Sequence, residues 1–161
     1  MHHHGYLWAG PKEAFDNEAL RRPPYSVPPP SWVTDDPSAE RLFRRYREVA
    51  AAFPTVDLPP LETAYWLIKP SSLVRGTWRE PKEAAAWMGE RLGEFAHRFA
   101  TDQERDPVRL ARLGGSAIER LASGGDVSLG IYLERPCYLS VALVTCSPNR
   151  SMPGLACPIQ T

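Results

Sequence analysis

The clearest pattern in the chain is the alternation of apolar and polar residues between positions 127 and 145, which predicts a β-hairpin. Its alternating aliphatic residues are Val127, Leu129, Ile131, Leu133, Leu139, Val141 and Leu143. A three-residue loop of Arg135, Pro136 and Cys137 would place Leu133 opposite Leu139 and all of these aliphatics on one face. A two-residue loop would slip the pairing by one residue and disperse them over both faces. We therefore expect the three-residue loop, which also gives the proline a turn position.

The opposite face of this hairpin is predicted to be shallow. Tyr132 and Tyr138 lie near the turn, and the other residues on that face are small, namely Ser128, Gly130, Ser140 and Ala142. Such a face lets another backbone or a flat ligand approach closely. The competing interpretation is that the chain's own proline-rich segment or a helix covers it.

Three amphipathic helices are predicted by apolar residues at spacings of three and four. The first begins at Asp36-Pro37 and reaches about Phe53, the second begins at Pro81, and the third begins at Asp106-Pro107. In each case proline at the first helical position favours the start. The third helix contains Gly114-Gly115, which predicts a bend, a break or very close packing.

The first 34 residues differ from the rest and are predicted to form an N-terminal arm. Tyr6-Leu7-Trp8 is expected to be a short edge strand, and a brief helix is expected from Pro11 to Leu20. The stretch 21–32 is rich in proline, favours polyproline II and cannot enter a sheet interior. We expect this segment to lie across the domain.

These elements together predict an α+β fold with one domain over residues 35–161. A further strand is predicted at Glu62 to Lys69, where apolar residues alternate on both sides. The expected sheet has three or four mainly antiparallel strands, including the hairpin 127–145. The helices beginning near Pro37, Pro81 and Asp106 are expected to pack on its aliphatic face.

The amino-acid composition argues against two classes of partner, nucleic acids and membranes. The chain has 161 residues, and its 19 basic and 19 acidic side chains cancel, so no field attracts nucleic acid or an anionic membrane. No apolar run approaches the length of about 18 residues that a membrane helix needs. We predict a cytoplasmic protein whose three cysteines are free thiols, although a Cys146–Cys157 bridge is sterically possible.

No metal ligand or cofactor is predicted. Glu94-x-x-His97 has the spacing of a di-metal motif but lies on the polar side of its helix. Cys137, Cys146 and Cys157 with one N-terminal histidine form a conceivable set, yet their spacing lacks the paired knuckles of zinc sites. We interpret the three histidines at positions 2–4 as native residues.

No catalytic constellation is predicted either, because the chain lacks a Gly-x-Ser-x-Gly elbow, a phosphate-binding glycine loop and a base beside any cysteine. The leading hypothesis is a non-catalytic binding or regulatory module for a protein partner or a small ligand. The alternative is a small enzyme centred on Cys146, and a third possibility is a homodimer through an exposed strand edge. The candidate binding residues are Trp87, Tyr132, Tyr138, Cys146, Asn149 and Arg150.

Overall fold

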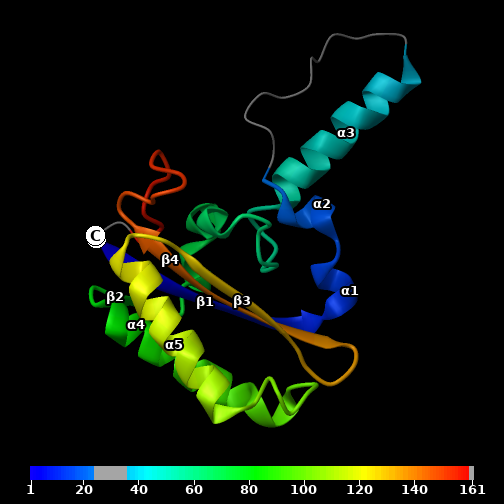
Figure 1. The fold of residues 1–161 in the computed structure, drawn as a ribbon. Coiled ribbons are helices and arrows are strands. Elements are labelled where there is room, and N and C mark those ends of the chain that lie inside the picture. Colours follow the sequence, from blue (N-terminus) through cyan, green and yellow to red (C-terminus); the bar gives the residue numbers. More distant parts are fainter. Residues whose placement is uncertain (24–35, 160–161) are drawn as a thin grey trace.

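The computed structural model describes residues 1–23 and 36–159 and confirms the α+β class. Its sheet has four antiparallel strands in the order β2-β1-β4-β3 (Figure 1). The strands are β1 (His2–Pro11), β2 (Gly76–Trp78), β3 (Val127–Tyr132) and β4 (Cys137–Cys146). The proline-rich segment predicted at 21–32 lies mostly outside the described residues.

Strand β1 is central, so the prediction of a short edge strand at Tyr6-Leu7-Trp8 was wrong. It pairs with β2 on one side and along its whole length with β4 on the other, from His2 opposite Cys146 to Pro11 opposite Cys137. Its backbone groups are paired on both sides over His3, His4 and Gly5, where β2 and β4 flank it. The N-terminus is therefore integral to the sheet.

The hairpin of β3 and β4 has the predicted face but a different register. Leu129 lies opposite Val141, and Ile131 lies opposite Leu139. The three-residue connection is 134–136, because Leu133 and Cys137 already pair through the Leu133 N–H and the Cys137 carbonyl. This shift of two residues leaves every side chain on its predicted face, since the side-chain period of a strand is two.

Helices α4 (Pro81–Phe95) and α5 (Pro107–Ala122) cover the aliphatic face of the sheet, as predicted. Asp106 caps α5 by accepting a hydrogen bond from the Arg109 N–H. Helix α5 runs through Gly114-Gly115 without interruption. Apart from the adjoining residues and the backbone of the helix itself, no described atom lies within 4 Å of a Cβ built at either position. Neither a break nor close packing therefore explains these glycines.

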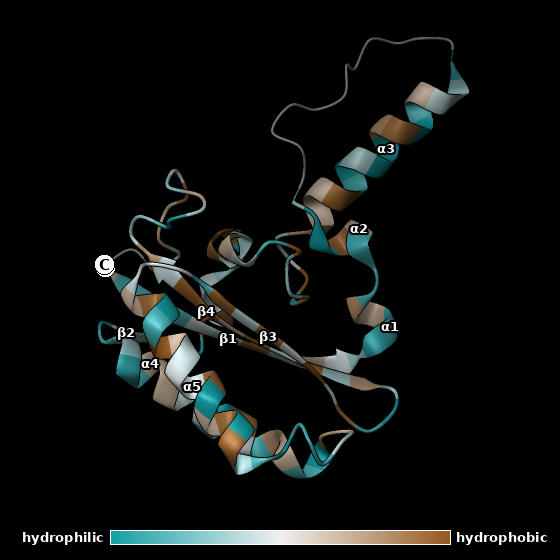
Figure 2. Ribbon diagram, in the orientation of Figure 1, coloured by the Kyte–Doolittle hydropathy of each residue, from teal (hydrophilic) through white to brown (hydrophobic). Residues whose placement is uncertain are grey.

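Helix α3 (Pro37–Ala52) does not join that layer, which corrects the expectation that it packs on the sheet. None of its residues is buried, and it extends away from the sheet with hydrophobic and hydrophilic residues along its length (Figures 1 and 2). Its C-terminal end is held by Lys69, whose ammonium donates to the Phe53 and Val56 carbonyls at 2.6 and 2.9 Å.

The second face of the sheet is covered by the chain itself over β1 and β4. The strand predicted at Glu62 to Lys69 is instead a 3-10 helix, η1 (Thr63–Ile68), and Trp66 stacks on Tyr6 with ring centroids 4.6 Å apart. Apolar residues alternating on both sides fit a short helix wedged against a sheet as well as a two-sided strand. The remaining short elements are α1 (Lys12–Phe15), α2 (Glu18–Arg21), η2 (Ser71–Leu73) and η3 (Ala96–Arg98). Among the described residues, no helix combines the length and apolar character that crossing a bilayer requires.

Candidate metal centre

The pairing of β1 with β4 brings three metal-binding side chains to one end of the sheet. His2 and His4 are two residues apart on β1 and so share a face. Cys146 lies directly opposite His2 and therefore projects from that same face. His3 projects from the other face, where its Nδ1 lies 3.0 Å from the Thr145 hydroxyl.

The fourth side chain is Cys157, from the tail that follows β4. The tail turns back because the buried side chain of Asn149 anchors it: its amide donates to the Asp126 carboxylate and the Thr145 carbonyl. The oxygen of the same amide accepts hydrogen bonds from the N–H groups of Ser151 and Met152. Asn149 thus fixes the turn that returns the chain over the face bearing the histidines.

The four donor atoms lie within 4.8 Å of one another. The His2 and His4 Nε2 atoms are 3.1 Å apart, and Cys157 Sγ is 3.4 Å from each of them. A tetrahedral zinc ion with usual bond lengths separates two nitrogens by about 3.4 Å and a nitrogen from a sulfur by about 3.6 Å. The cluster therefore has nearly the spacing of a tetrahedral N2S2 ligand set.

His4 is prepared to act as a ligand through Nε2. Its Nδ1 lies 2.8 Å from the Thr77 hydroxyl, the kind of contact that orients a metal-bound imidazole. Burial, followed by the neighbouring His2 and His3, lowers the pKa of His4 to about 4. The imidazole is consequently neutral at pH 7, which is the form that binds metals.

The two sulfurs occupy different surroundings. Cys146 is buried, with its Sγ 2.9 Å from the Ser147 hydroxyl, and burial raises the pKa of its thiol. Cys157 is half-buried, and its thiol lies 3.1 Å from the Ile159 carbonyl. A coordinated cation removes the thiol proton and reverses the effect of burial, so the raised pKa does not oppose metal binding.

A buried phenol beside the cluster lacks a hydrogen-bond partner. Tyr6 follows His2 and His4 on the same face of β1, and its ring packs in one cluster with Cys146 and Cys157. Its hydroxyl is buried and has no partner among the described residues. Leaving such a donor unpaired is costly, and a metal-bound thiolate is an acceptor that would satisfy it.

The predicted binding residues divide between several places. Cys146 belongs to the cluster. Asn149 anchors the turn of the tail that carries Cys157, and Arg150 is exposed on that tail. Tyr132 and Tyr138 are at the far end of the hairpin, in contact with each other. Trp87 is half-buried and packs against Trp78 with ring centroids 5.2 Å apart. The structure therefore does not bring these six residues together.

Cys137, the first cysteine of the conceivable set, lies at the opposite end of β4 from Cys146 and is excluded by that distance. The sequence signal for the observed His/Cys cluster is a His-x-His pair on a strand and a cysteine at a strand end. Recognising it requires the pairing of β1 with β4, which no local pattern indicates.

Comparison with known proteins adds no relative. Protein-family models, curated proteins and solved structures were each searched, and none of them matches this chain.

Proposed function

We propose that the protein is a metal-binding module that holds Zn²⁺ through His2 and His4 Nε2 and the sulfurs of Cys146 and Cys157. The observation that carries the proposal is the convergence of four soft or borderline donors, from three separate segments, at tetrahedral spacing. Two imidazoles and two thiolates are a ligand set typical of structural zinc.

All four positions of the proposed ion are filled by protein side chains, which favours a structural role over catalysis. The ion would join the first residues of β1, the last residue of β4 and the tail at one point. Zinc binding would then contribute directly to folding stability, because the unfolded chain does not hold these donors together. The proposal keeps the predicted non-catalytic character but departs from the prediction that the chain holds no metal ligand. A reducing cytoplasm would keep both thiols available.

The direct test is metal binding by the full chain without a polyhistidine tag, since added histidines would compete for the ion. We expect one equivalent of Zn²⁺ per chain, measured by competition with a chromophoric chelator. Replacement by Co²⁺ should give the visible bands of a tetrahedral ion together with sulfur-to-cobalt charge transfer. Octahedral Co²⁺ without sulfur charge transfer would contradict the proposal.

Matched cysteine variants sharpen this test. Cys146→Ser should remove one thiolate and weaken zinc binding by at least about a hundredfold, because sulfur is the stronger donor at this site. Cys137→Ser changes a half-buried thiol at the other end of the same strand and should leave affinity and spectrum unchanged. Equal effects of the two variants would remove the support for the site.

Tyr6→Phe separates the metal proposal from ordinary packing. If the phenol donates to a metal-bound sulfur, its removal should weaken zinc binding about tenfold, the usual lower effect of an outer-shell partner. In the metal-free protein the same change should be neutral or stabilising, because it removes a buried donor without a partner. An opposite pattern, with lost metal-free stability and unchanged affinity, would assign Tyr6 to the core alone.

A second candidate is a cysteine enzyme, and the contact of Cys157 with two imidazoles favours it. A nucleophilic Cys157 would use His2 or His4 as its base, at 3.4 Å from either Nε2. In this candidate the nucleophile is Cys157, whereas the sequence predicted an enzyme centred on Cys146. Rates of cysteine alkylation distinguish the two candidates. A catalytic Cys157 should react faster than Cys137 in the metal-free protein at neutral pH. If Cys157 is a metal ligand, added Zn²⁺ should protect it from alkylation.

A further inference from the structure

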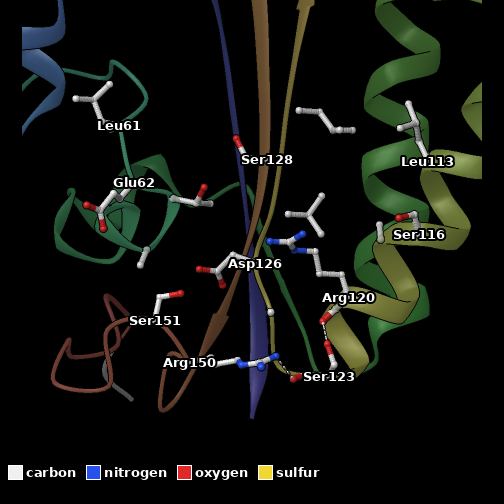
Figure 3. A pocket seen from close by; sticks show the side chains of 16 residues that line it. Leu61, Glu62, Leu113, Ser116, Arg120, Ser123, Asp126, Ser128, Arg150 and Ser151 are labelled. Carbon is white, nitrogen blue, oxygen red and sulfur yellow. Dashed lines mark hydrogen bonds between the residues drawn. The ribbon is translucent and has the colours of Figure 1, made fainter.

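The edge of the sheet formed by β3 lies at the floor of a groove of about 950 Å³ (Figure 3). One wall is helix α5, with Leu113, Ser116 and Ala117, and the other wall is the segment from Leu61 to Ala64. These walls belong to the two layers that cover opposite faces of the sheet. The groove is therefore the open margin between the layers, with a strand edge along it.

The hairpin register identifies which backbone groups of β3 lie on the outer edge of the sheet, where Ser128 lines the groove. Leu133 donates its N–H to the Cys137 carbonyl, so 133/137 is a hydrogen-bonded pair. Antiparallel pairs alternate, which makes the backbone groups of Ser128, Gly130 and Tyr132 point away from β4. The Tyr132 carbonyl confirms this direction, because it accepts the Ala100 N–H from outside the hairpin.

Ser128 and Gly130 have no such outer partner among the residues that the structure describes. Each offers one N–H and one carbonyl at the spacing of a further strand. Both residues are exposed, whereas the neighbouring Val127 and Ile131 are buried. An extended backbone is the chemistry that this row of donors and acceptors complements.

Side chains and charge define the occupant further. A strand added here would point alternate side chains toward Leu113 and Ala117 of α5 and toward Leu61 and Ala64 of the other wall. Near the start of β3, Arg120 and Arg150 line the groove, and neither forms an ion pair among the described residues. Two acidic residues line the groove as well. Glu62 lies on the wall opposite Arg120, and the Asp126 carboxylate already accepts hydrogen bonds from Thr145 and Asn149.

We propose that this groove binds an extended peptide segment of a partner protein as a fifth strand of the sheet, with a carboxylate of the peptide at Arg120 and Arg150. A second copy of this chain fits less well. In a second copy, β3 would be flanked by the same two walls, α5 and the segment 61–64. The walls of the two copies would collide before their β3 edges reached the strand spacing of about 4.8 Å. A single peptide strand is thin enough to enter.

The probe is a fluorescein-labelled peptide of alternating valine and threonine that ends in aspartate with a free C-terminus. We expect saturable binding to the full chain with a dissociation constant below about 1 mM. Ser128→Pro should weaken it at least about fivefold, because proline removes an outward donor at a position where an edge strand tolerates it. Ser128→Thr keeps the donor and should bind like the original protein.

Arg120→Ala combined with Arg150→Ala should weaken the aspartate peptide but not a threonine-ended, amidated version. Amide shifts of Ser128 and Gly130 in the unaltered chain give a second measurement in case Ser128→Pro fails to fold. The proposal is overturned by no binding, by equal binding to Ser128→Pro, by unmoved amides at 128 and 130, or by dimers that Ser128→Pro dissolves. The groove contains none of the four metal donors, so its failure would leave zinc binding untouched.

Discussion

The two ends of the β1–β4 ladder treat positive charge in opposite ways. At the turn end, the chain supplies its own cation: Lys12 Nζ lies 5.3 Å from the ring centroid of Tyr138 and 5.6 Å from that of Tyr132. At the other end, His2, His4 and Cys146 present lone pairs, and no lysine or arginine of the described residues forms a hydrogen bond with them. Burial, followed by the positive charges of the N-terminus and Arg79, lowers the pKa of His2. The first end is internally compensated, and the second has the composition of a cation site.

The contrast arises from the segments that return to each end. Helix α1 follows β1 directly and places Lys12 and Phe15 over the hairpin tyrosines, and Arg21 then stacks on Phe15 at 3.7 Å. The tail after β4 returns a cysteine instead. One ladder can therefore end in a cation–π cluster or in a metal-ligand cluster, depending on the segment that returns to it. The predicted binding role of Tyr132 and Tyr138 stays a prediction, with their ring faces already engaged by Lys12.

The largest effect should come from zinc. At a free Zn²⁺ concentration about a thousand times the dissociation constant, the ion should raise the free energy of unfolding by about 4 kcal/mol. Denaturant unfolding with zinc and with a chelator measures the difference. Cys146→Ser should lose most of this gain, whereas Lys12→Met should keep it. An unfolding midpoint that does not change with chelator would contradict this contrast, because neither end of the ladder would then depend on a metal ion for stability.

The next largest effect is a pH dependence of stability caused by Lys69. Like Lys12, Lys69 lies against an aromatic ring, but it is buried. Its Nζ lies 4.0 Å from the Phe53 ring centroid, and burial lowers its pKa from 10.5 to about 8. Between pH 8 and 10.5 the unfolded chain binds more protons than the folded chain at this residue, so stability should rise with pH in that window. The expected rise is about 3 kcal/mol in total, converted from the shift in pKa.

Lys69→Met should abolish this rise, and comparison of the two proteins cancels the titration of other groups. The substitution leaves the Phe53 and Val56 carbonyls without their donor, which costs about 1–3 kcal/mol at neutral pH, offset by removal of a buried charge. Lys82→Met is the matched control, since Lys82 is exposed. Parallel pH profiles for the Lys69→Met variant and the unaltered protein would show that burial of Lys69 has no energetic consequence.

Asn149→Ala should have a slightly smaller effect on stability and a second effect on zinc. Loss of the buried amide leaves the Asp126 carboxylate and two backbone N–H groups short of partners, which we expect to cost about 2 kcal/mol. The tail would also lose the turn that returns Cys157 to the histidines, so zinc affinity should fall. Arg150→Ala, one residue further along, should change neither quantity. Normal zinc affinity in Asn149→Ala would show that the tail reaches the site without this anchor.

The sequence was sufficient for the elements whose signal is local. Periodicity and an Asp-Pro start predicted α5, and alternation predicted both the hairpin and the face of Leu129 and Val141. The register was wrong by two residues because that shift preserves the alternation, which makes the two registers indistinguishable by pattern. The interpretation of 62–69 as a strand failed because its apolar residues on both sides fit a 3-10 helix equally.

The candidate site depended on long-range pairing, which is why the sequence missed it. His2, His4 and Cys146 meet only because β1 is central and runs antiparallel to β4, with partners more than 130 positions apart. The short Tyr6-Leu7-Trp8 pattern indicated an edge strand in an N-terminal arm. Asn149 was selected from the sequence as a candidate binding residue, whereas its side chain is buried and organises the tail.

The smallest effect should come from the turn end. Lys12 is part of an exposed cluster, with an ion pair to Asp16 at i,i+4, and contacts of this kind contribute little in water. Lys12→Met should therefore lower stability less than Cys146→Ser in the presence of zinc or Asn149→Ala, as measured by thermal unfolding, and should leave zinc affinity unchanged. If the two ends are independent, the effects of Lys12→Met and Cys146→Ser on stability should add in the double variant, because they lie at opposite ends of a ten-residue strand pairing. Non-additive effects would mean that the strand pairing transmits strain between its ends. The self-compensated end and the metal-binding end would then be energetically coupled and would not contribute to stability independently.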